Sequence, residues 1–513
     1  MTLHNSYAKL SWCAVCLLLS GCQTTYRWLD ERFEVRNSTP REALVSQDRR
    51  TEERRSLSSP DAQESDVDQA DAEISLVGHE ESDLNQEVAV QLPLDHVQAD
   101  QALLAGEAGA SLTLEALERM ALENNPAIQQ AMASVSKAAG FREQVGLLPN
   151  PTLAYDGQQL FDARTDQHML TLSQGIVTAH KLGLNRQVLN HSVQAQLWLV
   201  EVQRLRVLTD VRTTYYETLG AQRQLALATE FQVLAAKGVS IAQTRKVALE
   251  GSQPEILQAE IQLNEVELQQ QQSGIQVRAA WKDLAANVGL PDLSLVKLEG
   301  ELPKTAEPRD WDAVYEELAS RSPELRAAQS LIDRASANLC RQDVQAIPNL
   351  QMQLSAGKDY GTNSQIIMAS VGGALPVFNQ NQGNISAAHA EYCRATQEYQ
   401  RLRLSLKSRL ARSAQGYDSA RAAVQRYEGQ ILPRAKQSLT LSEQAYAAGE
   451  FNFLQVLTAR RIYFDSNLRA VDARRQLAQA ATLIDGLLLT GGLSDAVDTG
   501  DDDSLRGQAL SGQ

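Results

Sequence analysis

Apolar residues recur along this chain with two different periods, and the period changes at sharp boundaries. Residues 183–249, residues 254–288, residues 384–448 and the stretch from there to about residue 490 show the three- and four-residue spacing of amphipathic helices. The first of these helices would be about 100 Å long at 1.5 Å per residue. The chain is therefore predicted to be mainly α-helical, with helices far longer than those of an ordinary globular domain.

The long helices are expected to form two helical hairpins. Each pair is separated by only a few turn-forming residues, so consecutive helices should pack against each other. In the second long helix, Ile261, Leu268 and Ile275 are seven residues apart, which is the spacing of a coiled-coil seam. Pro433 falls inside the third long helix and is predicted to kink it.

Four short segments alternate between apolar and polar residues with a period of two. They are residues 152–155, 169–173, 350–355 and 367–372, and residues 161–166 form the turn between the first two. In the second segment, two leucines would lie on one face, with threonine and serine on the other. Because an isolated β-hairpin is marginally stable in water, these hairpins are expected to need further strands.

The whole arrangement is duplicated. Residues 248–259 and 448–459 align without a gap, and each interrupts a long helical run with a short turn. The preceding segments repeat in the same order, and offsets of 197 to 200 residues indicate almost no insertions. Two repeats are therefore assigned to residues 111–290 and 291–493, each with the order helix, β-hairpin, long helix, turn, long helix.

Short helices are predicted ahead of each hairpin. Thr113 is a plausible N-cap for the first ordered helix, and Asn125-Pro126 would start the next, with proline in its first turn. In the second repeat a helix opens at Asp312, and Ser322-Pro323 repeats the Asn125-Pro126 pattern.

Acidic residues are concentrated in the flanks of the chain. The net charge is −15, but residues 56–110 contain thirteen acidic residues and no Lys or Arg, whereas residues 111–493 sum to zero. Residues 22–110 are therefore interpreted as a disordered acidic tether, and residues 494–513 as a disordered acidic tail. No basic field that could attract nucleic acid is present.

The N-terminus carries an export signal. Lys9 precedes a short apolar run at residues 13–19, and Leu19-Ser20-Gly21-Cys22 resembles the lipobox of bacterial lipoproteins. Residues 1–21 are predicted to be a signal peptide and Cys22 to be acylated, with palmitate among its lipids. The alternative is a hydrophobic N-terminus with a chance cysteine. No run of 18 apolar residues occurs, so no membrane-spanning helix is expected.

The alternating strands suit the wall of a transmembrane β-barrel, with lipid outside and water inside. An open sheet edge is not tolerated in lipid, so the strands must close. One chain offers four strands, fewer than the eight of the smallest such barrels, whereas three copies would supply twelve. The alternative, a soluble helical rod with two added hairpins, does not explain the export signal.

Several motifs together resemble the TolC-type outer membrane efflux protein family. They are PVFNQNQG at residues 376–383, ILPRA at 431–435, YAAG at 446–449 and PNPTL at 149–153. The resemblance covers residues 111 to about 493 and is closest to the outer components of cobalt–zinc–cadmium cation exporters. It implies a homotrimer with a 12-stranded barrel in the outer membrane and a long α-helical tunnel through the periplasm. It also implies docking, turns first, onto a periplasmic adaptor and an inner-membrane pump of the resistance–nodulation–division (RND) type.

The two turns are the candidate periplasmic entrance and adaptor-docking site. The candidate residues are Leu249, Glu250, Gly251, Glu255, Gln258, Gly449, Glu450, Phe451, Gln455 and Thr458. Family members commonly carry acids six and nine residues beyond the turn glycine, where they form a charged constriction. Here these positions hold Gln455 and Thr458 in the second repeat and Glu255 and Gln258 in the first, where Leu249 replaces the turn glycine. We therefore expect a thin ring of acids and a closure that relies on helix packing.

No catalytic, cofactor or metal site is predicted, and the protein is not expected to be an enzyme. The seven histidines are scattered, and their spacing to Cys or carboxylates does not match a metal site. Arg460-Arg461 would usually be a solvated pair, with docking or pore lining as the alternative. Cys340 and Cys393 could pair in an oxidising periplasm, although two isolated buried thiols fit better.

Two functions of different classes remain. The first is the passive exit duct of a tripartite exporter, whose cargo could be heavy-metal cations, drugs or, in a type I secretion system, polypeptides. The second is a periplasmic adaptor or structural coiled-coil lipoprotein. An adaptor normally has one helical hairpin, and this chain has two helical hairpins and two membrane-type β-hairpins, so the first function is favoured.

Overall fold

The computed structural model describes residues 111–160, 164–249, 251–495, 497–498 and 504–511. The predicted signal peptide, Cys22, the tether and Glu250 lie outside these residues.

Helices dominate the fold, and their order repeats. The first half contains α4 (Leu114–Asn124), α5 (Pro126–Gln144), β1 (Thr152–Gln158), β2 (Gln167–Ile176), α6 (Lys181–Val247) and α7 (Gln253–Val288). The second half contains α8 (Trp311–Arg321), α9 (Pro323–Asp343), β3 (Leu350–Asp359), β4 (Ser364–Gly373), α10 (Gln382–Arg426), η1 (Tyr427–Ile431), α11 (Leu432–Ala447) and α12 (Phe453–Asp485). A further helix, α13, spans Ser504–Leu510. The prediction of a mainly helical fold with a small β part is confirmed.

The short helices begin where side-chain caps were predicted. The Thr113 side chain accepts a hydrogen bond from the backbone N–H of Ala116 at 3.3 Å, and Asn125 accepts one from Ala127 at 2.9 Å. Ser322 caps α9 in the same way. These bonds satisfy N–H groups that have no partner within the helix, which is why the helices start at these residues.

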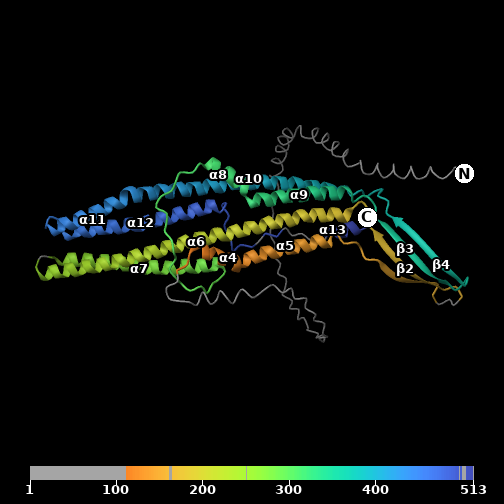
Figure 1. Ribbon diagram of the computed structural model, residues 1–513, viewed down its shortest axis with the longest axis horizontal. Helices are drawn as coiled ribbons and strands as arrows, with labels where there is room; N and C mark the ends of the chain where they lie inside the picture. The colour runs from red at the N-terminus through yellow and green to blue at the C-terminus, as the bar shows by residue number, and fades with distance from the viewer. Residues whose placement is uncertain (1–110, 161–163, 250, 496, 499–503, 512–513) are drawn as a thin grey trace, which may run out of the picture. The chain divides into compact units, whose positions relative to one another are not determined.

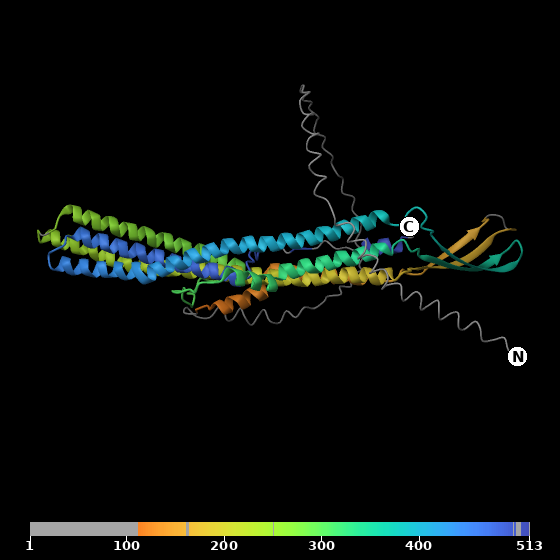
Figure 2. The ribbon, with the colours of Figure 1, turned by 90° about the horizontal axis from the view of Figure 1, so that it is seen from above.

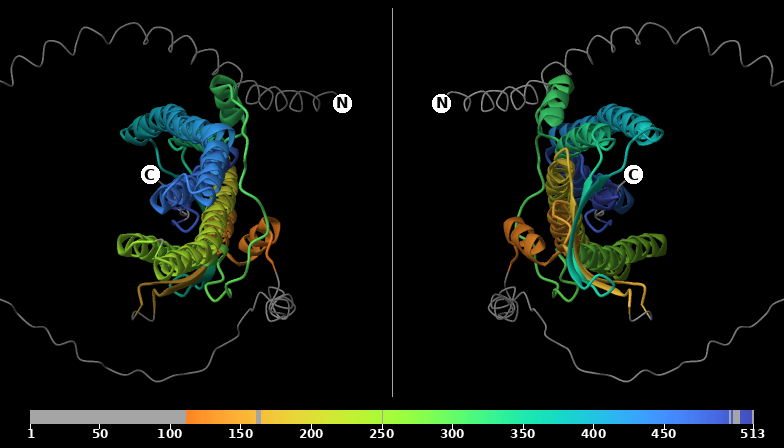
Figure 3. Two further views of the ribbon diagram at one scale, coloured as in Figure 1. Left: turned by 90° about the vertical axis from the view of Figure 1, so that its left-hand side faces the viewer. Right: turned by 90° about the vertical axis from the view of Figure 1, so that its right-hand side faces the viewer.

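The long helices pack lengthwise, with the strands and the turns at opposite ends (Figure 1). Helix α6 contacts α5, α7, α9 and α12, and α10 contacts α9 and α12. The α6–α7 and α11–α12 turns both lie at the end away from the strands (Figure 2). In the end-on views, α10 and the tip of the α6–α7 hairpin lie at opposite ends of a curved layer of helices (Figure 3).

Two cores hold the helices together. One buries leucines of α10 and α12, among them Leu406 and Leu477. The other joins α6 to α7 and α4 through Tyr215, Trp281 and Leu117. Burial of each large apolar side chain contributes roughly 1.5–3 kcal/mol, so these clusters account for much of the stability of the helical part.

The four strands form one antiparallel sheet in the order β1-β2-β3-β4. Leu172 lies opposite Leu354 and Thr171 opposite Ser355, so the two predicted hairpins are joined through β2 and β3. Strands β1 and β4 are the edges of this sheet. Each edge leaves a row of backbone N–H and C=O groups available for pairing.

The two faces of the sheet differ in polarity. The apolar face carries Leu153, Tyr155, Leu170, Leu172, Met352, Leu354, Ile367 and Val371, whose side chains are exposed in the single chain. The other face is linked by side-chain hydrogen bonds, including Thr171 to Ser355 at 2.7 Å and Thr152 to Ser173 at 2.5 Å. This alternation is the pattern of a sheet with lipid on one side and water on the other.

The third long helix is broken where the proline predicts a kink. Residues Tyr427–Ile431 form the π-helical turn η1, and Pro433 lies in the first turn of α11. Proline lacks an N–H, and its ring clashes with the carbonyl four residues earlier, which for Pro433 is that of Gly429 within η1. A π-turn is a common way of accommodating this disruption within a continuous helix.

The coiled-coil seam predicted for α7 is wrong as a seam within the chain. Ile261, Leu268 and Ile275 are more than half exposed. The residues that α7 buries include Val266 and Val277, which lie on another face of the helix. The sevenfold spacing therefore marks an apolar stripe with no partner in the single chain.

The prediction of a disordered tail is wrong for residues 504–511. They include α13, in which Ala509 is fully buried. Arg506 donates to the carbonyl oxygens of Gln144 and Leu147 at 2.8 and 2.6 Å, at the C-terminal end of α5. Asn185 of α6 donates to the Leu505 carbonyl at 2.9 Å. The exposed carbonyls of a helix end are good acceptors for arginine, which explains the docking.

The interpretation of Cys340 and Cys393 as buried thiols is also wrong. Both are unpaired and exposed. They lie on α9 and α10, on helix faces that the chain itself does not cover.

One helix of the described residues, α6, is long and apolar enough to cross a membrane by length and composition alone, with a mean hydropathy of 1.3 in its best window. A helix that packs within a bundle can meet the same criterion, and α6 packs against α4, α5, α7, α9, α12 and α13.

Candidate functional site at the hairpin turns

The turn between α6 and α7 is a left-handed helix cap formed by a leucine. Leu249 has a φ of 65°, and its side chain is 93% exposed. The backbone N–H of Gly251 donates to the Arg245 carbonyl at 3.1 Å, and that of Leu249 donates to Lys246 at 3.0 Å. A left-handed conformation costs a residue with a side chain roughly 1–2 kcal/mol. This turn is therefore strained.

The turn between α11 and α12 has the same form without the strain. Gly449 takes the left-handed position with a φ of 78°. Asn452 then starts α12 with a capping box, in which its side chain accepts from the Gln455 N–H at 3.0 Å and the Gln455 side chain accepts from the Asn452 N–H at 3.1 Å. Two N–H groups are satisfied reciprocally, which fixes the start of the helix.

The two turns lie together because their hairpins share a small core. This core contains Ala242 of α6, Ile256 and Ala259 of α7, and Phe453 and Leu457 of α12. The Tyr446 ring of α11 packs against Phe453, with 5.8 Å between ring centroids. Apolar packing therefore holds the second hairpin against the first at their tips.

A polar contact reinforces this packing. Arg245 of α6 donates to the Tyr446 hydroxyl at 2.7 Å, and its guanidinium lies 5.2 Å from the centroid of the same ring. Glu255 of α7 is 3.8 Å from Arg245 and is half-buried. One arginine therefore contacts both the tyrosine of the second hairpin and the carboxylate of the first.

The predicted entrance residues differ in their contacts and in their exposure to solvent. Glu255 faces Arg245 inside the protomer rather than solvent. Gln455 is used in the capping box, and the Thr458 hydroxyl donates to the Leu454 carbonyl of its own helix at 2.9 Å. The remaining described candidates, Leu249, Gln258, Gly449, Glu450 and Phe451, are exposed, and Gly251 is half-buried.

Arg460 and Arg461, predicted to be a solvated pair, both form ion pairs near the tips. Arg460 pairs with Glu443 of α11 at 2.9 Å, and Arg461 pairs with Glu265 of α7 at 3.6 Å. A cavity of about 240 Å³ lies beside them between the two hairpins, lined partly by Phe464. Arg461 therefore links the two hairpins, although its exposure makes the bond weak.

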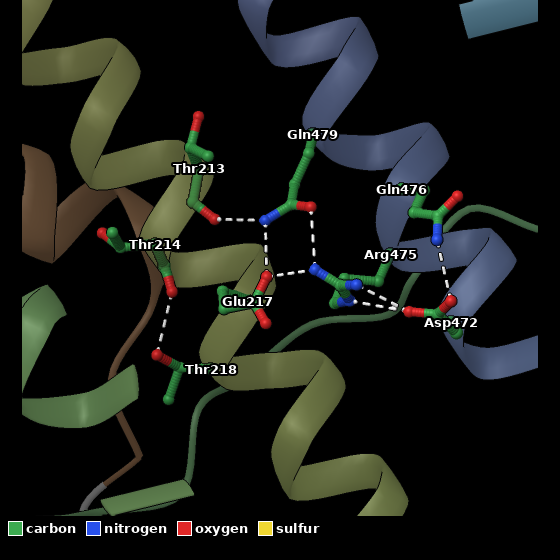
Figure 4. A network of polar contacts seen from close by, with 8 residues as sticks. All are labelled: Thr213, Thr214, Glu217, Thr218, Asp472, Arg475, Gln476 and Gln479. Atoms are coloured by element: carbon green, nitrogen blue, oxygen red, sulfur yellow. Dashed lines mark hydrogen bonds and ion pairs between the residues drawn. The ribbon is translucent and has the colours of Figure 1, made fainter. Parts of the chain in front are cut away.

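A stronger polar network joins α6 and α12 farther from the tips (Figure 4). Arg475 of α12 forms an ion pair with Glu217 of α6 and binds Asp472 at 2.6 Å. Gln479 donates to Glu217 at 2.8 Å and to the Thr213 carbonyl at 3.3 Å. Burial lowers the pKa of Arg475, but the hydrogen bonds and charges of Asp472 and Glu217 together outweigh it, so that the pKa is raised above its usual value.

Sequence reasoning missed this network, because its partners are 258 residues apart and no local pattern connects them. One residue in the sequence could have indicated this contact: Gly220, which lies one helical turn from Glu217 in α6. A Cβ added at Gly220 would lie 2.7 Å from the Arg475 side chain, so α6 and α12 approach closely there. In the described part of the chain, no group of three or more His, Cys, Asp or Glu side chains is arranged to hold a metal ion.

Comparison with known proteins finds a family model and several relatives that match this chain. The profile of the family described as "Outer membrane efflux protein" matches residues 314–488, which fall within the second repeat. The cobalt-zinc-cadmium resistance protein CzcC of Cupriavidus metallidurans is 27% identical over 386 residues, covering 74% of this chain and 91% of that protein. The pyoverdine export outer membrane protein OpmQ of Pseudomonas putida is 27% identical over 294 residues, covering 54% of this chain and 60% of that protein.

Solved structures share the fold. The outer membrane protein VceC of Vibrio cholerae superposes with a TM-score of 0.60 at 18% identity, covering 74% of this chain and 96% of that one. The structure of CusC gives a TM-score of 0.59 at 16% identity, covering 75% and 95%.

Proposed function

We propose that this chain, which belongs to the outer membrane efflux protein family, carries divalent heavy-metal cations out of the cell as the exit duct of a tripartite exporter. The protein is an outer membrane efflux channel that extends into the periplasm, and it is a passive conduit rather than an enzyme. The cargo, the oligomeric state and the partners are the proposed parts.

The two-faced sheet is the observation that carries the channel function. Its apolar face is exposed over all four strands. Its other face also carries Met169 and Met368, but it holds the polar side chains that hydrogen-bond across the strands. A sheet of this kind is stable when lipid covers the first face and water the second. The long helices continue from the strands, so a water-filled path through the membrane would extend between the helices (Figure 1).

Two unpartnered features support a trimer. Strands β1 and β4 are open edges, and lipid does not tolerate open edges, so β4 of one copy would pair with β1 of the next. Three copies give the twelve strands of a closed barrel. The exposed α7 stripe of Ile261, Leu268 and Ile275 would be covered by the neighbouring copy.

The hairpin tips are the proposed contact with a periplasmic adaptor. They lie at the opposite end from the membrane strands. They expose the whole Leu249 side chain and part of the Phe451 side chain. Exposed apolar residues on a rigid turn are typical of recognition sites. By the resemblance noted for the sequence, the adaptor would connect to an RND-type pump, and acyl chains on Cys22 would anchor the chain to the outer membrane.

The cargo is inferred from a relative that aligns over most of both proteins. The alignment with the cobalt-zinc-cadmium resistance protein covers 386 residues, which is 74% of this chain and 91% of that protein. The relative named for pyoverdine export aligns over only 60% of its length. Export of divalent cations such as Co²⁺, Zn²⁺ and Cd²⁺ is therefore the favoured function.

Two experiments test these proposals. Deletion of the gene should lower the tolerated concentrations of Co²⁺, Zn²⁺ and Cd²⁺ and raise cell-associated metal, with recovery on complementation by the unmodified gene. Unchanged metal tolerance together with new sensitivity to drugs would contradict the cargo assignment and leave the channel function standing. Light scattering of the detergent-solubilised protein should give three times the chain mass, and a stable monomer would contradict the trimer.

A further inference from the structure

A pocket with a single charged side chain lies where the strands meet the helices. Its volume is about 210 Å³, more than a single water molecule needs at ~30 Å³. Its walls come from the segments before β3 and after β4 and from Ser511, next to α13. The lining residues are Lys181, Ala346, Ile347, Pro348, Asn349, Ala374, Leu375, Pro376, Phe378, Asn379 and Ser511.

Lys181 is the charged residue, and its position is fixed. Only 1% of the residue is exposed, and its ammonium donates to the Ile347 carbonyl and to Asn349 Oδ1, the latter at 3.0 Å. Asn349 in turn donates to the Ala509 carbonyl of α13 at 2.6 Å, which orients its oxygen toward Lys181. An ammonium has three N–H donors, so these two bonds leave one for a molecule in the pocket.

A second cation lies buried nearby without an opposite charge. Arg341 is fully buried, and it donates to Asn185 at 2.6 Å and to Gln345 at 2.8 Å, while its Nη1 has no acceptor. Within the described residues neither Arg341 nor Lys181 forms an ion pair. Burial lowers the pKa of Arg341 to about 10, and burial together with the Arg341 charge lowers the pKa of Lys181 to about 8.

Two buried positive charges that have no carboxylate partner among the described residues carry a desolvation penalty that the protein's own side chains do not offset. An anion in the pocket would supply the missing charge and accept the free N–H of Lys181. Charge-assisted hydrogen bonds to phosphate oxygens are among the strongest that a protein makes.

The rim of the pocket is apolar. Leu375 is 83% exposed and Phe378 is 91% exposed, and both follow β4 within five residues of its end at Gly373. The apolar face of the sheet ends beside these residues: Leu350, the first residue of β3, lies opposite Gly373, the last residue of β4. A free inorganic anion would gain nothing from these side chains, whereas a lipid would cover them with its glycerol and acyl groups.

We propose that this pocket binds the phosphate of a phospholipid headgroup from the periplasmic leaflet of the outer membrane, with Lys181 donating to a phosphate oxygen and Leu375 and Phe378 contacting the lipid's apolar part. The proposal rests on the proposed function, because it requires the strands to span that membrane. Helix α13 would position the site by holding Asn349.

The test uses the full chain, purified in detergent, stripped of lipid and titrated with short-chain phosphatidylglycerol. We expect native mass spectrometry to show up to one bound lipid per protomer and thermal unfolding to shift upward. A diacylglycerol of the same chain length, which lacks the phosphate, should do neither. Lys181→Met should weaken lipid binding at least tenfold, Lys181→Arg should weaken it less, and Lys282→Met, on an exposed face of α7, should leave it unchanged.

Several outcomes would overturn the proposal. Equal binding by the unmodified protein and Lys181→Met would show that the lysine is not used, and equal protection by inorganic phosphate would show that the site is not built for lipid. If Lys181→Met does not fold, Phe378→Ser replaces it, and unchanged lipid affinity in that variant would also refute the assignment. A protein that conducts in planar bilayers but binds no phospholipid would refute this inference alone. A protein that forms no pores would refute the proposed channel.

Discussion

Replacement of Arg245 by methionine should loosen the contact between the two hairpins at their tips. Methionine keeps most of the apolar stem and removes the guanidinium. The variant loses the hydrogen bond to Tyr446 at 2.7 Å, the contact with the Tyr446 ring at 5.2 Å and the approach to Glu255 at 3.8 Å. It also leaves a half-buried Glu255 carboxylate without its cation.

The expected magnitude follows from these contacts. A hydrogen bond from a charged donor is worth about 1.5–3 kcal/mol, a cation–π contact roughly 0.5–1, and a partly exposed ion pair about 0–1. Allowing for water that replaces part of the lost contacts, we expect about 2 kcal/mol per protomer. Because ~1.4 kcal/mol corresponds to a factor of ten, the equilibrium between packed and separated tips should shift about 30-fold.

Single-channel recording in planar bilayers measures this shift. The Arg245→Met channel should spend a larger fraction of time in high-conductance states than the unmodified channel. Tyr446→Phe should show a smaller effect, because it keeps the ring and removes only the hydroxyl. Lys246→Met is the matched control, since Lys246 is the adjacent residue and contacts Gln253 within its own turn. If Arg245→Met conducts like the control, the tips are held by apolar packing alone and the reasoning is wrong.

Four further changes have definite expected results. Leu249→Gly should relieve the left-handed strain and stabilise the first turn by about 1 kcal/mol, seen as slower amide exchange around it. Thr458→Asp should strengthen block of conductance by divalent cations, because it adds three carboxylates to a trimer; micromolar block of the unmodified channel would contradict the expected thin ring of acids. Cys22→Ser should abolish acylation, and mass spectrometry showing an unmodified N-terminus elsewhere in the unaltered protein would refute the lipid anchor. The pKa of Lys181, about 8 against 10.5 when exposed, means that the unfolded chain binds the proton more tightly. Stability of the lipid-free protein should therefore rise from about pH 8 to about pH 10.5, and Lys181→Met should remove that rise.

The repeat, the strands and the helix starts could be predicted because they depend on neighbours in the sequence. Asn125-Pro126 and Thr113 begin helices through bonds to the next few residues, and the alternation in residues 169–173 sets which side chains share a face. The break at Pro433 has the same local origin. Such features need no knowledge of distant contacts.

Features that depend on distant partners could not be predicted. The spacing of Ile261, Leu268 and Ile275 shows that α7 has an apolar stripe, but it does not show that the covering surface is missing from the chain. Glu255 was expected at the entrance as a free carboxylate, yet it faces Arg245, whose other partner Tyr446 is 201 residues away in the sequence.

The tail was misjudged for a compositional reason. Its five Asp residues dominate the average over residues 494–513, and an average conceals a short docking helix. Leu505 and Ala509 are four residues apart, which places them on one side of α13. Ala509 is the buried residue of the pair.

The π-turn η1 separates a long helix, α10, from a short one, α11, in the second hairpin. Helix α6 is continuous over 67 residues, whereas α11, beyond η1, has only 16. At 1.5 Å per residue, α11 is a lever about 24 Å long. A bend of about 10° at η1 would move the tip by about 4 Å, and three tips that moved outward together in the proposed trimer would increase the distance between neighbouring tips by up to ~7 Å. In the proposed trimer, a small rotation at one irregular turn would therefore change the width of the opening between the hairpin tips by several ångströms.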